Sequence, residues 1–545
     1  MLLAVCQKRL ELSSYAIELL SWQGGIRPSM VKEIFFSVLS IMRISLQKTI
    51  NKAIEKLFKS AIDGNRFVLL LLRSSAFLWR APMGVFEFRR GNISASLRYL
   101  ENAKLHVNAS RLCLTRALEI QKVLDSGPQC SKPPVGSKPF NGKVLLSCHS
   151  NGHFHKNGYA IRTSQIANAL ADQGIEVFAC TRLGYPWDLF DVEIEVGAEY
   201  TIYEHLKYKH FYDPRKRISG PESEYINEYA DLLAQEAALR GVTVIHAHSS
   251  YVNGLAACMA AKKIGIVAVY EMRGLWHLSR AVKEPGYSAT EHFRYCQSME
   301  LTAAKSANKV ITLSSAMRDW CVEHGIDFAK ITVVPNAIDK KYTETKKVVK
   351  AEEENTFRIG FIGSVTEYEG VDDVIKAISQ LTPRGYDISL TIAGDGYYLP
   401  EVKKLCRSLG LESRVNFVGR ISRDKVSELY KNIDLAVVLR KNSPLTRLVP
   451  PLKLAESICA GVPTLITNLP PLTEVTGSDI SQLIVEPGDI EGIAVRLITL
   501  MENRKNLTEI AQQLQQRVEF HYNWSANGKL YNGIYTESCL AASKH

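Results

Sequence analysis

From about residue 143 to the C-terminus, short apolar segments alternate with amphipathic stretches in two successive series. The first series is KVLLSC (143–148), VFACTR (177–182), VTVIHAH (242–248), VAVYEM (267–272), KVITLS (309–314) and ITVVPN (331–336). The second is RIGFIG (358–363), SLTIAG (389–394), VNFVG (415–419), LAVVL (435–439) and VPTLIT (462–467). Near-continuous apolar strands separated by helices are typical of parallel sheets covered on both faces. The pattern predicts an α/β protein with two facing Rossmann-like domains, whose site lies in the cleft at the carboxyl ends of the strands.

The first quarter of the chain follows a different pattern. Residues 1–126 are rich in Leu, Ile, Ala, Lys and Arg at helical spacing, as in SVLSIMRISLQKTINKAIEKLFKSAI and SRLCLTRALEIQKVL. The segment SGPQCSKPPVGSKPFNG has the Pro, Gly and Ser content of a linker. The predicted order is an all-helical N-terminal domain (1–126), a linker (127–142), a first Rossmann-like domain (143–340) completed by a crossover helix (520–545), and a second Rossmann-like domain (341–519).

The composition is that of an ordinary globular protein, with 46% hydrophobic and 23% charged residues among 545. The 11 cysteines are scattered and form no CxxC, so we expect neither a disulfide framework nor a zinc site, and a cytoplasmic location. The start, MLLAVCQKRLELSS, lacks the pattern of a signal peptide. The most apolar run, FVLLLL, ends at Arg73 and is shorter than the roughly 20 residues of a membrane span.

Positive charge is concentrated near the start of the chain. Residues 1–140 hold 21 of the 67 Lys and Arg and 9 of the 56 Asp and Glu residues, an excess of +12, which leaves 46 basic and 47 acidic side chains elsewhere. Such an excess suits an anionic membrane surface, which would make the protein peripheral on the inner face of the membrane. A solvated basic face on a helical domain explains the charge equally well. Nucleic acid is not expected as a partner, because no recognised motif accompanies the charge.

The segment TRLVPPLKLAESICAGVP (446–463) contains a candidate anion site. Two prolines end at Pro451, Lys453 follows, and Glu456 lies in the first turn of an apparent helix, KLAESICA. The free N–H groups and the dipole of a helix N-terminus attract anions. A nucleotide sugar suits both features, because its diphosphate matches the N–H groups and its ribose diol matches the carboxylate of Glu456.

Polar residues also mark the ends of strands in the first series. KVLLSC runs into a loop with Gly152 and Gly158, where glycine lets backbone approach a phosphate, although glycines after a strand commonly form only a turn. The nearby histidines of this loop do not have the spacing of a standard metal site: His149, His153 and His155.

Two later strands of the series also end on ionisable groups. His248 ends VTVIHAH, while Glu271 and Arg273 end VAVYEM and precede Trp276. A single histidine at a strand end is structural more often than catalytic. Several polar strand ends that converge on one cleft are a stronger signal of a functional site.

Ten segments of the chain resemble, in order, those of family 4 glycosyltransferases with the GT-B fold. They are NGYAIRT, TRLGYP, IHAHSSYVNGLAA, VYEMRGLW, KVITLSSAM, KITVVPNAID, IGFIGSVTEYEGVDD, LTIAGDG, VNFVGRIS and PPLKLAESICAGVPTLIT. FHYNWSANGKLYNGIY resembles the segment that returns to the first domain in this fold. The resemblance implies a retaining, hexosyltransferase-type enzyme that moves a sugar from a nucleotide-diphosphate donor to a glycan or lipid-linked acceptor, commonly in surface polysaccharide or glycolipid assembly. It implies no cofactor and no metal.

The resemblance also assigns residues to the site. His248, Lys453 and Glu456 are the implied catalytic residues, with His248 bonded to the transferred sugar. The implied donor-binding residues are Asn157, Gly158, Tyr159, Gly363, Ser364, Gly419, Arg420, Ile421, Arg440, Arg447, Pro451 and Leu452. The implied acceptor-side residues are Arg162, Glu271, Arg273 and Trp276.

Two departures from the family pattern affect the charge of this site. The family often has an acid–x7–acid pair, but eight residues before Glu456 this chain has Leu448. Many members place an Arg and a Lys in the loop after the first strand of the second domain, where this chain has Ser364 and Glu369. We therefore expect the cations for the diphosphate to come from Arg440, Arg447 and Lys453, because two unneutralised negative charges are costly to bury.

Two other functions fit the same fold. A non-catalytic nucleotide-sugar-binding protein would bind the donor without hydrolysing it. A nucleotide-sugar epimerase would release an isomer without needing an acceptor.

Overall fold

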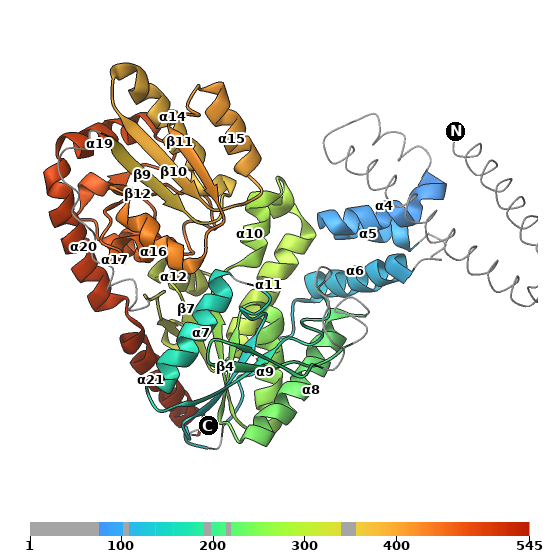
Figure 1. The fold of residues 1–545 in the computed structure, drawn as a ribbon. Helices are drawn as coiled ribbons and strands as arrows, with labels where there is room; N and C mark the ends of the chain where they lie inside the picture. Colours follow the sequence, from blue (N-terminus) through green and yellow to red (C-terminus); the bar gives the residue numbers. More distant parts are fainter. Residues whose placement is uncertain are drawn as a thin grey trace, which may run out of the picture.

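The computed structural model describes residues 76–101, 108–136, 138–155, 157–189, 198–213, 220–338 and 356–543 (Figure 1). The N-terminal part of this structure is helical, with α4 (Ala76–Arg90), α5 (Ile93–Leu100) and α6 (Asn108–Ser126). The predicted helical segment at 110–124 falls inside α6, whereas the one at 37–62 lies outside the described residues.

The first half of the protein is built on an eight-stranded sheet in the order β3-β4-β2-β1-β5-β6-β7-β8, in which only β3 and β4 are antiparallel. The strands are β1 (Lys143–Cys148), β2 (Glu176–Thr181), β3 (Tyr200–Tyr203), β4 (Leu206–Lys209), β5 (Val244–His248), β6 (Val267–Met272), β7 (Lys309–Thr312) and β8 (Ile331–Val333). The helices are α7 (Gly158–Ala171), α8 (Glu222–Arg240), α9 (Tyr251–Ile264), α10 (Trp276–Lys283), α11 (Glu291–Ser306) and α12 (Ser315–Glu323).

Helices cover both faces of this sheet, which explains its continuous apolar strands. Leu145 of β1 packs with residues of α8, α9 and α11 on one face, while its neighbours Val144 and Leu146 pack with α7 and the C-terminal helix on the other. Each fully buried aliphatic side chain contributes about 1.5–3 kcal/mol to folding. The side chains that alternate along β1 therefore hold the helices on both faces of the sheet.

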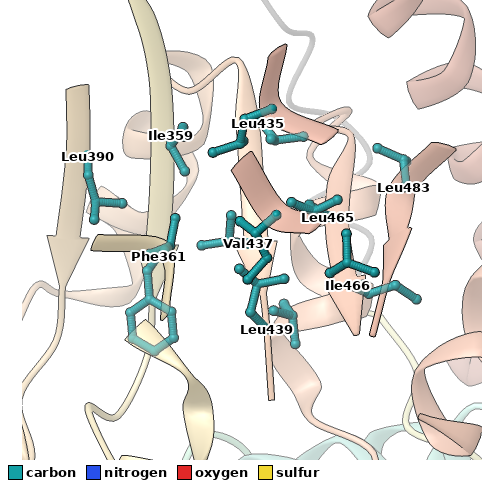
Figure 2. Packing of buried hydrophobic residues seen from close by; sticks show 14 of the residues in the cluster. Ile359, Phe361, Leu390, Leu435, Val437, Leu439, Leu465, Ile466 and Leu483 are labelled. Carbon is teal, nitrogen blue, oxygen red and sulfur yellow. The ribbon is translucent and has the colours of Figure 1, made fainter. Parts of the chain in front are cut away.

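The second half is built on a six-stranded, wholly parallel sheet in the order β11-β10-β9-β12-β13-β14. Its strands are β9 (Phe357–Ile362), β10 (Ile388–Ala393), β11 (Val415–Gly419), β12 (Leu435–Val438), β13 (Thr464–Thr467) and β14 (Ile484–Val485). Its helices are α14 (Val371–Leu381), α15 (Leu399–Ser408), α16 (Arg423–Lys431), α17 (Leu452–Cys459), α18 (Pro470–Thr476) and α19 (Ile490–Glu502). Figure 2 shows the buried side chains of its strands, among them Phe361 and Val437.

The strand order of each half agrees with a doubly wound α/β fold and confirms the predicted fold class. Each of the eleven segments predicted from the sequence overlaps a strand of the structure, and β2, β9 and β10 begin one residue earlier than predicted. Strands β3, β4 and β14 were not predicted. Strand β3 lies at a sheet edge without a fully buried residue and β14 has two residues, so neither has the continuous apolar pattern of a central strand.

The C-terminal helices connect the two halves. Helix α20 (Leu507–His521) packs on the second half, and α21 (Trp524–Ala542) returns to the first half, where it packs on α7 and β6 (Figure 1). There Tyr531 donates a hydrogen bond of 2.6 Å to Oε2 of Glu271, and Tyr535 lies 2.8 Å from Nδ1 of His246. This arrangement agrees with the crossover expected from the sequence around Trp524.

Glu271 is the centre of a buried ion cluster beneath this helix. Its Oε1 accepts from Nε of Arg162 at 3.0 Å and from Nε of Arg273 at 2.6 Å, and the carboxylate is fully buried. Burial alone would raise the pKa of Glu271, but the two guanidinium groups outweigh it and hold the pKa well below its usual range. The cluster joins α7, β6 and α21 through one charged carboxylate.

The N-terminal helices pack on the first half next to α10 and α11. Ile93, Leu97 and Ile120 form an apolar cluster with Tyr295 of α11. Glu119 of α6 accepts from the backbone N–H groups of Glu222 and Ser223 at the start of α8, at 2.7 and 2.8 Å. A carboxylate at a helix N-terminus stabilises the helix, so α6 is attached by charge as well as by apolar contact.

We predict that Glu271→Gln lowers the free energy of unfolding by about 3–5 kcal/mol, because it removes the charge that Arg162 and Arg273 share in the interior. Chemical denaturation of the full chain measures this loss. The control Glu284→Gln removes the exposed partner of Arg280 and should change stability by less than about 1 kcal/mol. Equal stability of Glu271→Gln and the wild type would contradict the central role of this carboxylate.

Candidate functional site

Ligands in doubly wound sheets bind where neighbouring strands lead to connections on opposite sides of the sheet. In the first sheet this switch point lies between β1 and β5, which are hydrogen-bonded neighbours. His149 follows β1, and His248 ends β5, in register with Glu271 of β6. The strand ends that the sequence singled out therefore lie at one edge of the sheet.

His248 is fully buried at this switch point. Its Nδ1 lies 3.3 Å from Oγ1 of Thr163 and 3.7 Å from Sγ of Cys148, while Nε2 has no hydrogen-bond partner among the described residues. Burial first, and then the charge of Arg273, lower the pKa of His248 well below its ordinary value. Its unpartnered Nε2 is buried too, so the bond to a sugar hydroxyl that the resemblance implies stays a prediction.

The start of α7 lies beside this histidine. The side chain of Asn157 caps the helix by accepting from the N–H of Ala160 at 3.0 Å, and the helix begins at Gly158. The hydroxyl of Tyr159 accepts from the N–H of His149 at 2.7 Å and donates to the carbonyl of His248 at 3.2 Å. Tyr159 thereby fixes the helix start against the two strand ends, and Asn157 and Gly158 stay exposed.

Arg162 and Glu271 do not line an open surface, and this corrects their expected place on the acceptor side. Arg162 is 2% exposed and donates to the carbonyls of Val334 and Pro335, as well as to the carboxylate of Glu271. All of these partners lie inside the first half. The two residues therefore act on the site only by supporting the side chains around them.

Arg273 is buried as well, which also corrects its expected place on the acceptor side, whereas Trp276 lies at the surface. Nη1 of Arg273 donates to Oγ1 of Thr163 at 2.7 Å and to the carbonyl of Tyr159 at 3.0 Å, while its Nη2 has no partner among the described residues. Trp276 begins α10, is 40% exposed and meets the ring of His149 edge-on with centroids 4.5 Å apart. The exposed ring of Trp276 is therefore the one residue of this expected set that could contact an acceptor from the surface.

In the second sheet the switch point lies between β9 and β12. Gly363 follows β9 with a φ of +145°, and Ser364 next to it is exposed. A Cβ at Gly394, which follows β10, would lie 1.8 Å from the carbonyl oxygen of Gly363. The loops after β9 and β10 therefore run backbone against backbone, and only glycine allows this approach.

A buried group of three charges fills this second switch point. Nζ of Lys453 donates to Oε2 of Glu369 at 2.7 Å, and Nε of Arg440 forms an ion pair with Oε1 of Glu369 at 3.4 Å. Arg440 also donates to the carbonyl of Val449 at 2.6 Å. The structure thus brings together two of the three expected cations. Arg447, the third, has an exposed side chain and makes no ion pair within 4.0 Å among the described residues.

Helix α17 begins at Leu452, directly after Pro451 and one residue before the predicted helix KLAESICA, so Lys453 is its second residue. Glu456 lies in the second turn, not in the first as expected, and shares a helix face with Lys453 three residues earlier. Burial lowers the pKa of Lys453, while Glu369 and Glu456 oppose this effect. The α17 N-terminus thus presents N–H groups, an ammonium group and a half-buried carboxylate together.

Gly419 ends β11, the edge strand of the second sheet, and Arg420 and Ile421 follow it. Arg420 is largely exposed and pairs with Asp395, in the loop after β10, at 3.2 Å. In the order of the sheet, β11 lies on one side of β9, with β10 between them, while β12 and the Lys453 group lie on the other side of β9.

The two switch points face each other where the halves meet. A Cβ at Gly158 would lie 3.0 Å from Cδ1 of Leu452, so the N-termini of α7 and α17 are in contact. Nδ2 of Asn336 donates to the carbonyl of Pro450 at 3.3 Å, which fixes the approach to α17 on the first half. Two helix N-termini that meet in this way, with Lys453 between the strand ends, favour an anion.

The described residues contain no cluster of three or more His, Cys, Asp or Glu side chains that could hold a metal ion. No helix within the described ranges has the length and apolar character needed to cross a bilayer.

Two protein-family models match the chain in succession. The model described as "Glycosyl transferase 4-like domain" matches residues 157–337, and "Glycosyl transferases group 1" matches residues 343–517. Together they cover the first and second α/β halves.

Curated relatives and solved structures agree with these models. The N-acetyl-alpha-D-glucosaminyl L-malate synthase of Bacillus anthracis is 23% identical over 72% of this chain and 96% of its own length. A glycogen synthase of Mycobacterium tuberculosis is 23% identical over 52% of this chain and 65% of its own length. The match thus spans less than two thirds of this glycogen synthase (65%) and of another relative, an uncharacterized glycosyltransferase of Methanocaldococcus jannaschii (62%).

Among solved structures, sucrose-phosphate synthase from Thermosynechococcus elongatus superposes with a TM-score of 0.58 at 17% identity, covering 73% of this chain and 99% of that one. Anabaena HepE in complex with UDP-glucose superposes with a TM-score of 0.54 at 14% identity, covering 72% and 99%. At these identities the likeness establishes the fold. Because the two family models match the two halves in succession, the chain belongs to the glycosyltransferases that combine a 4-like domain with a group 1 domain, and it has the GT-B fold.

Proposed function

We propose that this glycosyltransferase transfers a hexosyl group from a nucleotide-diphosphate sugar to an acceptor hydroxyl with retention of anomeric configuration. The observation that carries the proposal is the pair of cations, Lys453 and Arg440, at the β9/β12 switch point. They lie beside the N-terminus of α17, which touches the N-terminus of α7 across the two halves. This arrangement supplies positive charge where a diphosphate would leave.

The second half supplies the proposed contacts to the nucleotide. The diphosphate takes the N–H groups at Pro451–Lys453, the ammonium group of Lys453 and the guanidinium of Arg440. The carboxylate of Glu456, one turn further along α17, accepts from the ribose hydroxyls. Backbone at Gly419–Ile421 brackets the base, at the opposite end of the donor. HepE and a starch synthase, both similar in fold, were solved with UDP-glucose and ADP, which supports a nucleotide sugar as the donor.

The first half supplies the proposed contacts to the sugars. The free Nε2 of His248 bonds a hydroxyl of the transferred sugar, while Asn157–Tyr159 close over the phosphate. The exposed ring of Trp276 binds the acceptor at the mouth of the site. Retention requires the acceptor hydroxyl on the face from which the diphosphate leaves, so the leaving phosphate can accept the proton. The protein then contributes positioning and charge stabilisation, and no pair of catalytic carboxylates is needed.

A non-catalytic donor-binding protein remains the second candidate, because Glu369 neutralises part of the positive charge at the diphosphate position. Loss of charge stabilisation would slow transfer more than it weakens binding. Assays of donor hydrolysis and of sugar transfer therefore distinguish the two functions, whereas an assay of donor binding alone does not.

The proposed acceptor is a glycan or a lipid-linked molecule in surface polysaccharide or glycolipid assembly. The N-terminal helices pack beside α10, whose first residue is Trp276, and Nη2 of Arg280 in α10 donates to the carbonyl of Arg89 in α4 at 2.5 Å. Arg89 and Arg90 at the end of α4 are exposed. A basic surface next to the acceptor side supports docking on an anionic membrane, where such an acceptor is anchored.

Transfer is tested with the full chain and a panel of nucleotide sugars, by thermal shift, donor hydrolysis and product analysis by NMR. We expect donor-dependent transfer with retained configuration. Lys453→Ala should lower kcat by about a hundredfold with little loss of thermal stability, because Arg440 still neutralises Glu369 while the leaving charge loses its ammonium partner. The exposed-residue control Lys431→Ala should match the wild type. Donor binding without hydrolysis or transfer would favour the non-catalytic function.

Glu456→Gln should weaken donor binding by roughly tenfold or more, because hydrogen bonds to a charged acceptor contribute about 1.5–3 kcal/mol. Isothermal titration calorimetry with the nucleoside diphosphate measures the change. Glu502→Gln, an exposed substitution at the end of α19, serves as the matched control. Wild-type affinity in Glu456→Gln would remove Glu456 from the ribose position.

Membrane docking predicts that the full chain co-sediments with phosphatidylglycerol-containing vesicles at low salt, less at high salt, and not with phosphatidylcholine alone. Each Lys or Arg near an anionic surface contributes about 1 kcal/mol. The double variant Arg89→Gln, Arg90→Gln should therefore bind more weakly. If the wild type stays in the supernatant with anionic vesicles at low salt, a protein-interaction role for the basic helices replaces membrane docking.

A further inference from the structure

Glu369 has an unusual place for a carboxylate in a site proposed to bind a diphosphate. It is the last residue of the 3-10 helix Glu367–Glu369, just before α14, and is 6% exposed. Both of its oxygens are engaged by cations from other elements, Lys453 of α17 and Arg440 after β12. A carboxylate repels a diphosphate, so its presence here needs a physical reason.

The backbone holds Glu369 in this place. Gly370 has a φ of +68°, and a Cβ there would lie 1.8 Å from the carbonyl oxygen of Leu439. The loop after β9 is therefore pressed against the end of β12, directly before Arg440. A side chain at residue 370 would force these two loops apart. The glycine thus sets the carboxylate of Glu369 next to the guanidinium of Arg440.

Lys453 reaches the same carboxylate from the opposite direction. Its Nζ lies 4.2 Å from the ring centroid of Phe361 in β9 and would lie 3.2 Å from a Cβ at Gly363. The ammonium group therefore crosses the carboxyl end of β9, where the donor diphosphate is proposed to bind. Glu369 is the group that holds it there by a direct hydrogen bond.

Two cations share the carboxylate of Glu369, so these three groups together carry a charge of +1. Glu456, three residues after Lys453 on α17, acts on the same ammonium group with the opposite charge. Without Glu369, the ammonium and guanidinium groups would repel each other in a poorly solvated place. Burial would then favour the neutral form of Lys453, and Glu456 would be the remaining carboxylate that opposes it.

We propose that Glu369 is a positioning residue, which holds Lys453 and Arg440 side by side at the end of β9 so that both can meet the leaving diphosphate. The inference rests on the proposed function and deepens it. In this chain the cations of the site come from α17 and from the end of β12, and the loop after β9 supplies the carboxylate that fixes them. Glu369 itself does not contact the donor.

The test is the pH dependence of kcat/KM in Glu369→Gln, because this parameter reports the protonation of the free enzyme. Glu369 raises the pKa of Lys453, so its neutralisation should lower that pKa and move the alkaline limb of the profile to lower pH. The groups that act on Lys453 are Glu369, Arg440 and Glu456. We also expect kcat to fall roughly tenfold to a hundredfold, since a displaced catalytic group loses that much.

A second background separates positioning from general damage to the fold. In Lys453→Arg the cation does not titrate in the accessible range, so adding Glu369→Gln should no longer move the alkaline limb. The control Glu367→Gln changes an exposed carboxylate of the same 3-10 helix and should leave the profile unchanged. Nucleotide affinity by calorimetry should change little in Glu369→Gln, because a competing carboxylate and a fixed cation are lost together.

The outcomes distinguish this inference from the proposed function. The positioning role is overturned if the alkaline limb of the kcat/KM profile does not move in Glu369→Gln, or if it moves equally in the Lys453→Arg background. In both cases the wild type still transfers sugar. Absence of transfer by the wild type overturns the proposed function instead. If Glu369→Gln does not fold, Glu369→Asp keeps the charge but shortens the arm. The Glu369→Asp variant should keep the alkaline limb of the wild-type kcat/KM profile but have a lower kcat. An unchanged kcat overturns the proposal.

Discussion

The buried carboxylate of Glu271 is the interaction on which the arrangement of the first half depends. It is charged in the interior only because Arg162 and Arg273 surround it, and Tyr531 donates to it from the last helix of the chain. Removing water from a charge is costly, and this cost is offset only when every partner is in place. Helix α7, strand β6 and helix α21 must therefore dock together or not at all.

This cluster also prepares the chemistry above it. The guanidinium of Arg273 is oriented by Glu271 and then reaches Thr163 and the carbonyl of Tyr159. The same guanidinium adds to burial in keeping His248 neutral. Because α21 belongs to the segment that returns from the second half, the site of the first half is complete only when the whole chain is folded. Stability and site geometry are thus linked through one residue.

A different electrostatic requirement applies in the second half. A diphosphate needs cations, but cations at the end of a buried strand must be held without water. Glu369 provides the counter-charge, while Gly370 and the loop contact with Leu439 set its position. The likeness to solved GT-B structures, at 13–17% identity, shows the fold alone and assigns no role to these charged residues.

The sequence by itself determined the two parallel sheets, because an apolar strand covered on both faces leaves a continuous local signal such as VAVYEM. It also indicated a helix start just after Pro451 and the polar strand ends at His248 and Arg273, which depend on residues close together in the chain. It placed Arg162 and Glu271 on an open surface because burial of a charge cannot be read from local pattern.

Only the tertiary structure decided which charges meet. Glu369 and Lys453 are 84 residues apart, and Glu271 and Tyr531 are 260 apart. The spacing of hydrophobic residues is a property of neighbouring positions in the chain. An ion pair between two elements depends instead on how the loops of those elements pack. Glu369 was visible in the sequence only as a missing cation. Its role as the group that holds Lys453 and Arg440 follows from the packing of the β9 loop against the end of β12.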